Sequence, residues 1–170
     1  TEHDPENPPT DASLKQTSGA VKQAWQQTLE DLESLPAERE AEGWEVTTVR
    51  ADHTDVVSKD MGEDDRFGLS HVVSKSVGEA FVDAYDEDAF TEFLAYGTVV
   101  DGRRFGVTEL VDPTEERTIA IAYEYPLRRL RGLPQNAQEE GAVNTYVRKI
   151  DGTILGTFRH EEYEPLLPSV

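Results

Sequence analysis

Apolar residues near the start of the chain recur at helical spacing. Residues 13–35 place them on one stripe with polar residues opposite, a pattern typical of a long amphipathic helix. The stripe consists of Leu14, Val21, Trp25, Leu32 and Leu35. Residues 37–42 then predict a short second helix, which Gly43 ends.

Apolar and polar residues alternate over much of the remaining chain, which predicts half-buried strands. Residues 44–49 and 67–73 show this pattern, and the acidic, glycine-containing residues 52–66 between them predict a loop. A capping-box spacing at Ser76 predicts the start of a helix there. In residues 119–125, Ile and Tyr occupy one face and alanines the other, so we expect a helix to approach the alanine face closely.

Two Asp-Gly pairs predict hairpins, because both positions of such a turn need a positive φ. The pairs are Asp101-Gly102 and Asp151-Gly152, and each separates two apolar runs. Leucines in residues 127–133 predict a further helical segment. Together these elements predict an α+β fold, with an antiparallel sheet of about six to seven strands packed by a long N-terminal helix and two shorter helical segments.

The charge of the chain says more about the solution conditions in which the protein works than any motif does. The chain has 35 acidic and 16 basic side chains, a formal net charge of −19, and its basic residues are 11 Arg and only 5 Lys. Such self-repulsion destabilises a compact state in dilute buffer, but the Debye length of about 3 Å in molar salt screens it. The composition therefore favours a salt-in halophile. The alternative is an acidic mesophilic protein with a disordered tail.

The distribution of residue types also predicts the domain organisation and location. No cysteine is present, which excludes disulfides and thiolate sites and fits a reducing cytoplasm. No apolar run approaches the roughly 20 residues of a membrane span, so no membrane association is expected. Residues 1–12 hold three prolines and four acidic side chains and predict a mobile acidic arm. Residues 13–170 are expected to form a single α+β domain of a cytoplasmic protein.

Three short segments carry a family resemblance. They are GWEV at residues 43–46, ELVD at residues 109–112 and VRKIDGT at residues 147–153. With them, most of residues 13–164 resembles an uncharacterised haloarchaeal family, a domain of unknown function. The motifs are structural, so the resemblance implies a halophilic setting and transfers no catalytic residue.

Common reaction motifs do not occur in the sequence. We find no Gly-x-Ser-x-Gly, phosphate loop, dinucleotide fingerprint or His-Glu-x-x-His, so no cofactor is predicted. The aspartates of residues 83–88 lack calcium-loop spacing and are expected to be a solvated face, so no metal site is predicted either. His53 is expected to be an exposed loop histidine rather than a metal ligand or base.

His71 and His160 share strand faces with apolar residues, which leaves two interpretations. They are either satisfied core or edge histidines, or members of a general acid/base cluster. In the second case a strand carboxylate, Glu109 or Glu124, completes a pocket of a hydrolase-like enzyme. Their convergence cannot be read from the sequence alone.

Arginines gather in the second half of a chain that otherwise avoids cations. Residues 1–100 carry 23 acidic and 7 basic side chains, whereas residues 101–170 carry 12 and 9. The clustered residues are Arg103, Arg104, Arg128, Arg129 and Arg131. They predict a site for a protein or an acidic small molecule, with internal pairing to carboxylates as the alternative.

The preferred function is therefore a non-enzymatic cytoplasmic binding or interaction module whose partner is unknown. A small-ligand pocket protein, or a hydrolase-like enzyme that uses His71 or His160, is the alternative. Nucleic acid is an unlikely partner, because phosphate binding through counterion release weakens steeply with salt.

Overall fold

The computed structural model describes residues 11–60 and 65–168, with side chains from residue 19 onwards. Residues 1–10 of the predicted arm lie outside the described residues, and residues 11 and 12 belong to the first helix. The helices are α1 (Asp11–Ser34), α2 (Ala37–Ala41), α3 (Lys75–Ala84) and α4 (Leu133–Glu140), with short 3-10 helices η1 (Leu127–Arg129) and η2 (Glu164–Leu166). The strands are β1 (Glu45–Arg50), β2 (His53–Val57), β3 (Gly68–Val72), β4 (Glu92–Val100), β5 (Arg103–Asp112), β6 (Arg117–Pro126), β7 (Val143–Arg148) and β8 (Ile154–His160).

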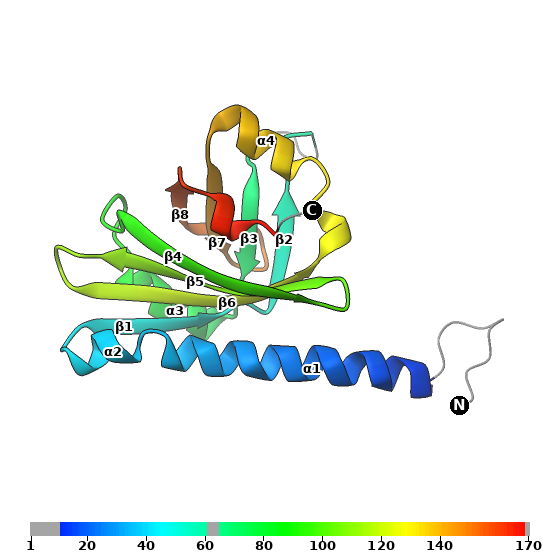
Figure 1. The fold of residues 1–170 in the computed structure, drawn as a ribbon. Helices are drawn as coiled ribbons and strands as arrows, with labels where there is room; N and C mark the ends of the chain where they lie inside the picture. Colours follow the sequence, from blue (N-terminus) through cyan, green and yellow to red (C-terminus); the bar gives the residue numbers. More distant parts are fainter. Residues whose placement is uncertain (1–10, 61–64, 169–170) are drawn as a thin grey trace.

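The strands of the described chain form two four-stranded sheets (Figure 1). The first sheet has the order β1-β6-β5-β4 and the second β2-β3-β7-β8. Each contains one parallel pair, β1 with β6 and β3 with β7, among antiparallel pairs. The mixed α+β class is thus confirmed, whereas the prediction of one antiparallel sheet of six to seven strands is wrong.

The chain passes from one sheet to the other at a corner between β1 and β2. The Ala51 N–H donates to the Ala122 carbonyl in the first sheet, at 3.0 Å. The next N–H, of Asp52, donates to the Val72 carbonyl in the second sheet, at 2.8 Å. Strand β2 therefore occupies part of the predicted loop 52–66. Its polar residues His53 and Asp55 hid the strand pattern, because they lie on the face of β2 that is less buried.

The main core lies between the two sheets, and β6 shows how its residues divide. Ile119 and Ile121 pack towards the second sheet with Val147 and Phe158, while α3 covers this core through Phe81. On the opposite face of β6 the alanines contact α1, which runs along the outer face of the first sheet (Figure 1). The predicted close approach of a helix to the alanine face is confirmed.

The two Asp-Gly turns differ in detail. At the β4–β5 hairpin, Asp101 and Gly102 have φ values of 51° and 73°, as the turn prediction requires. The β7–β8 pair is also antiparallel, but only the glycine of its turn, Gly152, has a positive φ, 96°. A register shift between Val147 and Arg148 widens this turn.

Helix α3 begins two residues earlier than its capping-box spacing predicts. Ser74, rather than Ser76, is the N-cap, and its side chain accepts from the Val77 N–H at 3.4 Å. None of the helices in the described part of the chain combines the length and apolar character needed to cross a membrane.

Candidate anion-binding site

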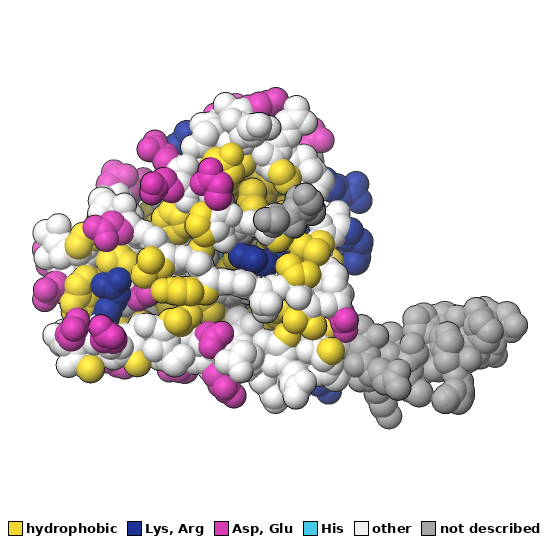
Figure 2. Space-filling view, in the orientation of Figure 1, with side chains coloured by type: hydrophobic (Ala, Val, Ile, Leu, Met, Phe, Trp, Pro, Cys, Tyr) yellow, Lys and Arg dark blue, Asp and Glu magenta, His cyan; other side chains and the backbone are white. Residues whose placement is uncertain are grey.

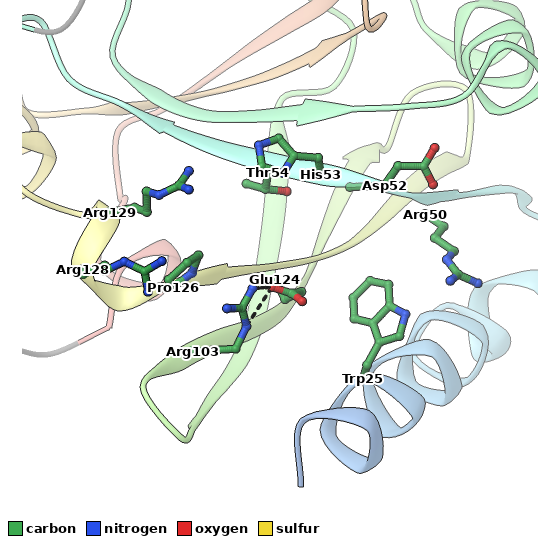
Figure 3. Close-up of a pocket in the computed structure, with 11 residues that line it drawn as sticks. Trp25, Arg50, Asp52, His53, Thr54, Arg103, Glu124, Pro126, Arg128 and Arg129 are labelled. Atoms are coloured by element: carbon green, nitrogen blue, oxygen red, sulfur yellow. Dashed lines mark hydrogen bonds and ion pairs between the residues drawn. The ribbon is translucent and has the colours of Figure 1, made fainter. Parts of the chain in front are cut away.

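A pocket of about 350 Å³ opens at the corner between β1 and β2 (Figure 3). Four arginines line it, and Trp25 of α1 forms part of its wall. The four are Arg50, Arg103, Arg128 and Arg129. We call this site the arginine pocket. It collects a quarter of the 16 basic side chains of the protein.

Sheet geometry brings these arginines together from distant parts of the sequence. Arg103 begins β5 and is in register with Pro126 at the end of β6. The segment that follows Pro126 is η1, so its residues Arg128 and Arg129 lie beside Arg103. Arg50 comes from the end of β1, with its guanidinium 5.6 Å from the ring centre of Trp25.

Carboxylates neutralise only part of this charge. Arg103 is paired with Glu124, and its Nε lies 3.1 Å from the carboxylate. Arg128 and Arg129 are exposed and make no ion pair with any residue of the described chain. Asp52 is the other carboxylate in the wall, so the four arginines leave the pocket with a formal charge of +2.

His53 also lines the pocket, but it is bonded to a neighbour. Its Nε2 lies 2.7 Å from Oδ1 of Asp55, which in turn accepts from Nη2 of Arg148 at 2.6 Å. Burial raises the pKa of Asp55, but the hydrogen bonds from Arg148 and His53 outweigh burial and lower the pKa overall. Asp55 is thus held as a carboxylate, and His53 lies in β2 rather than in the predicted loop.

The chemistry of the pocket is recognition of anions. A guanidinium group offers a planar fork of N–H donors that matches a carboxylate or a phosphate, and it keeps its proton at neutral pH. The indole of Trp25 adds an apolar surface against which the stem of a ligand can pack. The described residues contain no cluster of His, Asp and Glu that could hold a metal ion.

The remaining arginines of the predicted partner site lie elsewhere. Arg104 follows Arg103 in β5 and faces the opposite side of the sheet, where it is 8% exposed and Nη2 donates to the Pro165 carbonyl at 2.9 Å. Arg131 is exposed near Asp60. The pKa of Asp60 is lowered mainly by the hydrogen bond from Ser58 and to a smaller extent by Arg131.

Both histidines of the predicted acid/base cluster are buried between the sheets. His71 is fully buried, with Nδ1 2.9 Å from the Thr54 hydroxyl, and burial together with nearby His160 lowers its pKa to about 3. His160 lies with Nε2 2.8 Å from the Thr145 hydroxyl, and burial lowers its pKa to about 4. Both are neutral at pH 7.

The two predicted carboxylates lie on the other face of the first sheet. Glu109 is buried against α2, where it accepts from Nε of Arg39 at 3.2 Å and from the Thr118 hydroxyl at 3.1 Å. Glu124 lines the arginine pocket. The structure therefore does not bring His71 and His160 together with either carboxylate, because strand alternation places Glu124 opposite its neighbours Tyr123 and Tyr125.

Sequence reasoning found Arg103, Arg128 and Arg129 but missed the rest of the pocket. It assigned Trp25 to the apolar stripe of α1, where the ring does pack partly against the core. Arg50 gave no signal, because it is a single cation at the end of a strand. Only the corner into β2 places it opposite η1.

Comparison with known proteins gives a family match over most of the chain. A model described as a family of unknown function (DUF7529) matches residues 11–168. No curated protein and no solved structure matches the chain. The match covers all the elements described above but brings no activity with it, so function must be argued from the geometry.

Proposed function

The chain belongs to the DUF7529 family of unknown function, and we propose that it is a binding module for an anionic partner. The arginine pocket is the proposed site, and the partner presents a carboxylate or phosphate group on a protein or a small molecule. The observation that carries this proposal is the exposure of Arg128 and Arg129 without an ion pair to any described residue.

The charge of the whole protein makes these two arginines unusual. At a net charge of −19, an exposed arginine has many carboxylates with which to pair. Figure 2 shows acidic side chains spread over the visible face, with basic ones at the edge where η1 lies and at a few other places. Arginines kept unpaired in such a field favour an anion from outside the chain over internal neutralisation.

The proposed setting is the cytoplasm of a salt-in halophile. Net charge, the preference for arginine over lysine and the lack of cysteine support it. Molar salt screens long-range attraction, but a bidentate contact between a guanidinium and an oxyanion acts at short range and retains its geometry. The same argument disfavours nucleic acid, whose affinity rests largely on counterion release.

We propose binding rather than catalysis because of the residue types in the pocket. Guanidinium groups hold anions but do not exchange protons near neutral pH. His53 is the histidine in the pocket wall, and its Nε2 is hydrogen-bonded to Asp55. A hydrolase-like reaction at His71 or His160 would need a carboxylate partner, and Glu109 and Glu124 face away from both.

Trp25 offers a direct test, because the protein has only two tryptophans. In the variant Trp44→Phe, Trp25 becomes the sole indole and reports on the pocket. Titration in molar KCl with pyrophosphate, and separately with a short polyglutamate peptide, should give a saturable change in its fluorescence. Charge-assisted hydrogen bonds contribute about 1.5–3 kcal/mol each, so replacing Arg128 and Arg129 with Gln should weaken binding at least about tenfold.

The matched control is the double variant Lys149→Gln, Arg159→Gln, which removes two exposed cations outside the pocket. It should leave the titration unchanged. Equal binding by the Arg128/Arg129 double variant and its parent would refute the proposed site, as would the lack of a saturable response to either probe.

A further inference from the structure

A second set of polar groups lies between the two sheets, on the opposite face of β5 and β6 from the arginine pocket. Five buried side-chain atoms in the described structure have no hydrogen-bond partner. They are Nε2 of His71, Nε of Arg104, Oγ1 of Thr108 and the hydroxyls of Tyr123 and Tyr125. Buried polar atoms are nearly always paired, so five in one region call for an explanation. We call these residues the inter-sheet cluster.

The other four residues of the cluster all lie near Tyr123. The ring of Tyr123 lies 4.9 Å from the ring of His71 and 6.1 Å from that of Tyr125, centre to centre. Burial raises the pKa of the Tyr123 hydroxyl, while Arg104 and Thr108 are close enough to lower it in part. Neither of these two side chains forms a hydrogen bond of normal geometry with that hydroxyl.

Two glycines make room for the polar ends of this cluster. Gly97 of β4 and Gly106 of β5 are direct neighbours in the sheet register. A Cβ atom on Gly97 would lie 2.6 Å from Nε of Arg104, and one on Gly106 would lie 2.6 Å from the Tyr123 hydroxyl oxygen. Any larger residue at either position would displace a member of the cluster.

All five unpartnered atoms can act as donors. Nε of Arg104 always carries its proton, and the three hydroxyls can each donate one. His71 donates from Nε2 in the tautomer whose Nδ1 accepts from the Thr54 hydroxyl, a contact of 2.9 Å. The site therefore offers two N–H and three O–H donors, and of these groups only the hydroxyl oxygens can also accept.

The cluster also carries an unbalanced charge. Arg104 is 8% exposed and pairs with no carboxylate of the described chain; its guanidinium donates to the Pro165 carbonyl. Glu124, next to Tyr125, is paired with Arg103 on the opposite face of the sheet. Water could satisfy the hydroxyls, but it would leave the positive charge of Arg104 uncompensated in the interior.

We infer that the inter-sheet cluster is a binding site for a small inorganic anion of the halide class. A halide ion accepts hydrogen bonds from several directions and suits a site whose donors come from three neighbouring strands, β3, β5 and β6. It also supplies the negative charge that Arg104 lacks. The site is distinct from the arginine pocket, because Arg103 and Arg104 point to opposite faces of the first sheet.

Bromide is the probe for the direct test. Crystals of the full chain grown in molar potassium bromide should show an anomalous peak between the sheets, within hydrogen-bond distance of Nε of Arg104 and the Tyr123 hydroxyl. Bromide at surface positions alone, with only water or nothing between the sheets, would overturn the inference.

A solution experiment tests the same site by thermal unfolding. The midpoint is measured in potassium chloride and in potassium gluconate at equal ionic strength, so the difference isolates the small anion from general screening. The parent should show a higher midpoint in chloride. Arg104→Met and Tyr123→Phe should lose most of that difference, whereas Arg159→Met, with the same change in net charge, should keep it.

Tyr123→Phe removes one hydroxyl and keeps the ring, so it tests the site even if the Arg104→Met variant does not fold. A difference between chloride and gluconate that is equal in Tyr123→Phe and the parent contradicts the site. No difference in the parent contradicts it as well. Either result leaves the pyrophosphate titration of the arginine pocket unaffected, so the two proposals fail separately.

Discussion

Mild acid should unfold this protein because two neutral histidines are buried between its sheets. Burial lowers the pKa of His71 to about 3 and that of His160 to about 4, from an ordinary value of 6.5. Since folding lowers both pKa values, the unfolded chain binds more protons than the folded chain between the folded pKa values and pH 6.5. The stability that depends on the neutral rings is complete above pH 6.5 and is lost as the pH falls from there towards the folded values.

The size of the effect follows from the number of protons. Each proton bound only by the unfolded chain changes the free energy of unfolding by about 1.4 kcal/mol per pH unit. Between about pH 6.5 and pH 5, each histidine therefore removes about 2 kcal/mol, and the pair about 4 kcal/mol. This is a large part of the 5–15 kcal/mol typical of a folded domain.

Urea unfolding followed by circular dichroism in molar KCl, at intervals from pH 7 to about pH 5, measures this slope. Ordinary carboxylates titrate below this range, at about 4, so they contribute little to it. His71→Gln should roughly halve the pH dependence, while Arg159→Gln, at an exposed position, should retain it. A free energy of unfolding that stays constant from pH 7 to pH 5 would refute the reasoning.

Three further predictions follow from charge and packing. The net charge of −19 should make the thermal midpoint rise from dilute buffer to molar KCl, and a high midpoint already present in dilute buffer would count against the halophile proposal. Gly97→Ala places a Cβ 2.3 Å from Cζ of Arg104 and should lower the free energy of unfolding by about 1–3 kcal/mol. Gly19→Ala has no atom within 4 Å of the new Cβ, so it should stabilise α1 by up to about 1 kcal/mol. Arg117→Met removes the 2.7 Å ion pair of Asp112, whose carboxylate keeps the N–H donors of Thr114 and Glu115, and should cost about 1–3 kcal/mol in urea unfolding; an unchanged free energy of unfolding would contradict that role.

Local pattern was enough to predict most of the elements. The apolar stripe predicted α1, and the alanines of β6 predicted the helix that packs on them. Asp101-Gly102 predicted the β4–β5 hairpin, because the turn conformation depends on those two residues alone. Net charge and residue counts likewise need no structure, and they carry the halophile proposal.

The pattern of apolar and polar residues did not predict the elements whose formation depends on a partner strand far away in the sequence. Strand β2 is short and carries polar residues on its less buried face, so it reads as part of a loop, and only pairing with β3 makes it a strand. The parallel pairing of β1 with β6 joins segments about seventy residues apart in the register Glu45 with Arg117. Nothing in either segment specifies the other, so the division into two sheets could not be predicted.

The arginine pocket, too, could be predicted only in part from the sequence. The sequence by itself determined that arginines are concentrated after residue 100 and that Arg128 and Arg129 follow the end of a strand at Pro126. The tertiary structure alone decided that Arg50 joins them and that Arg104 turns inward. The physical reason is that periodicity tells which residues share a face of one element, whereas the contents of a pocket depend on which elements the fold places opposite one another.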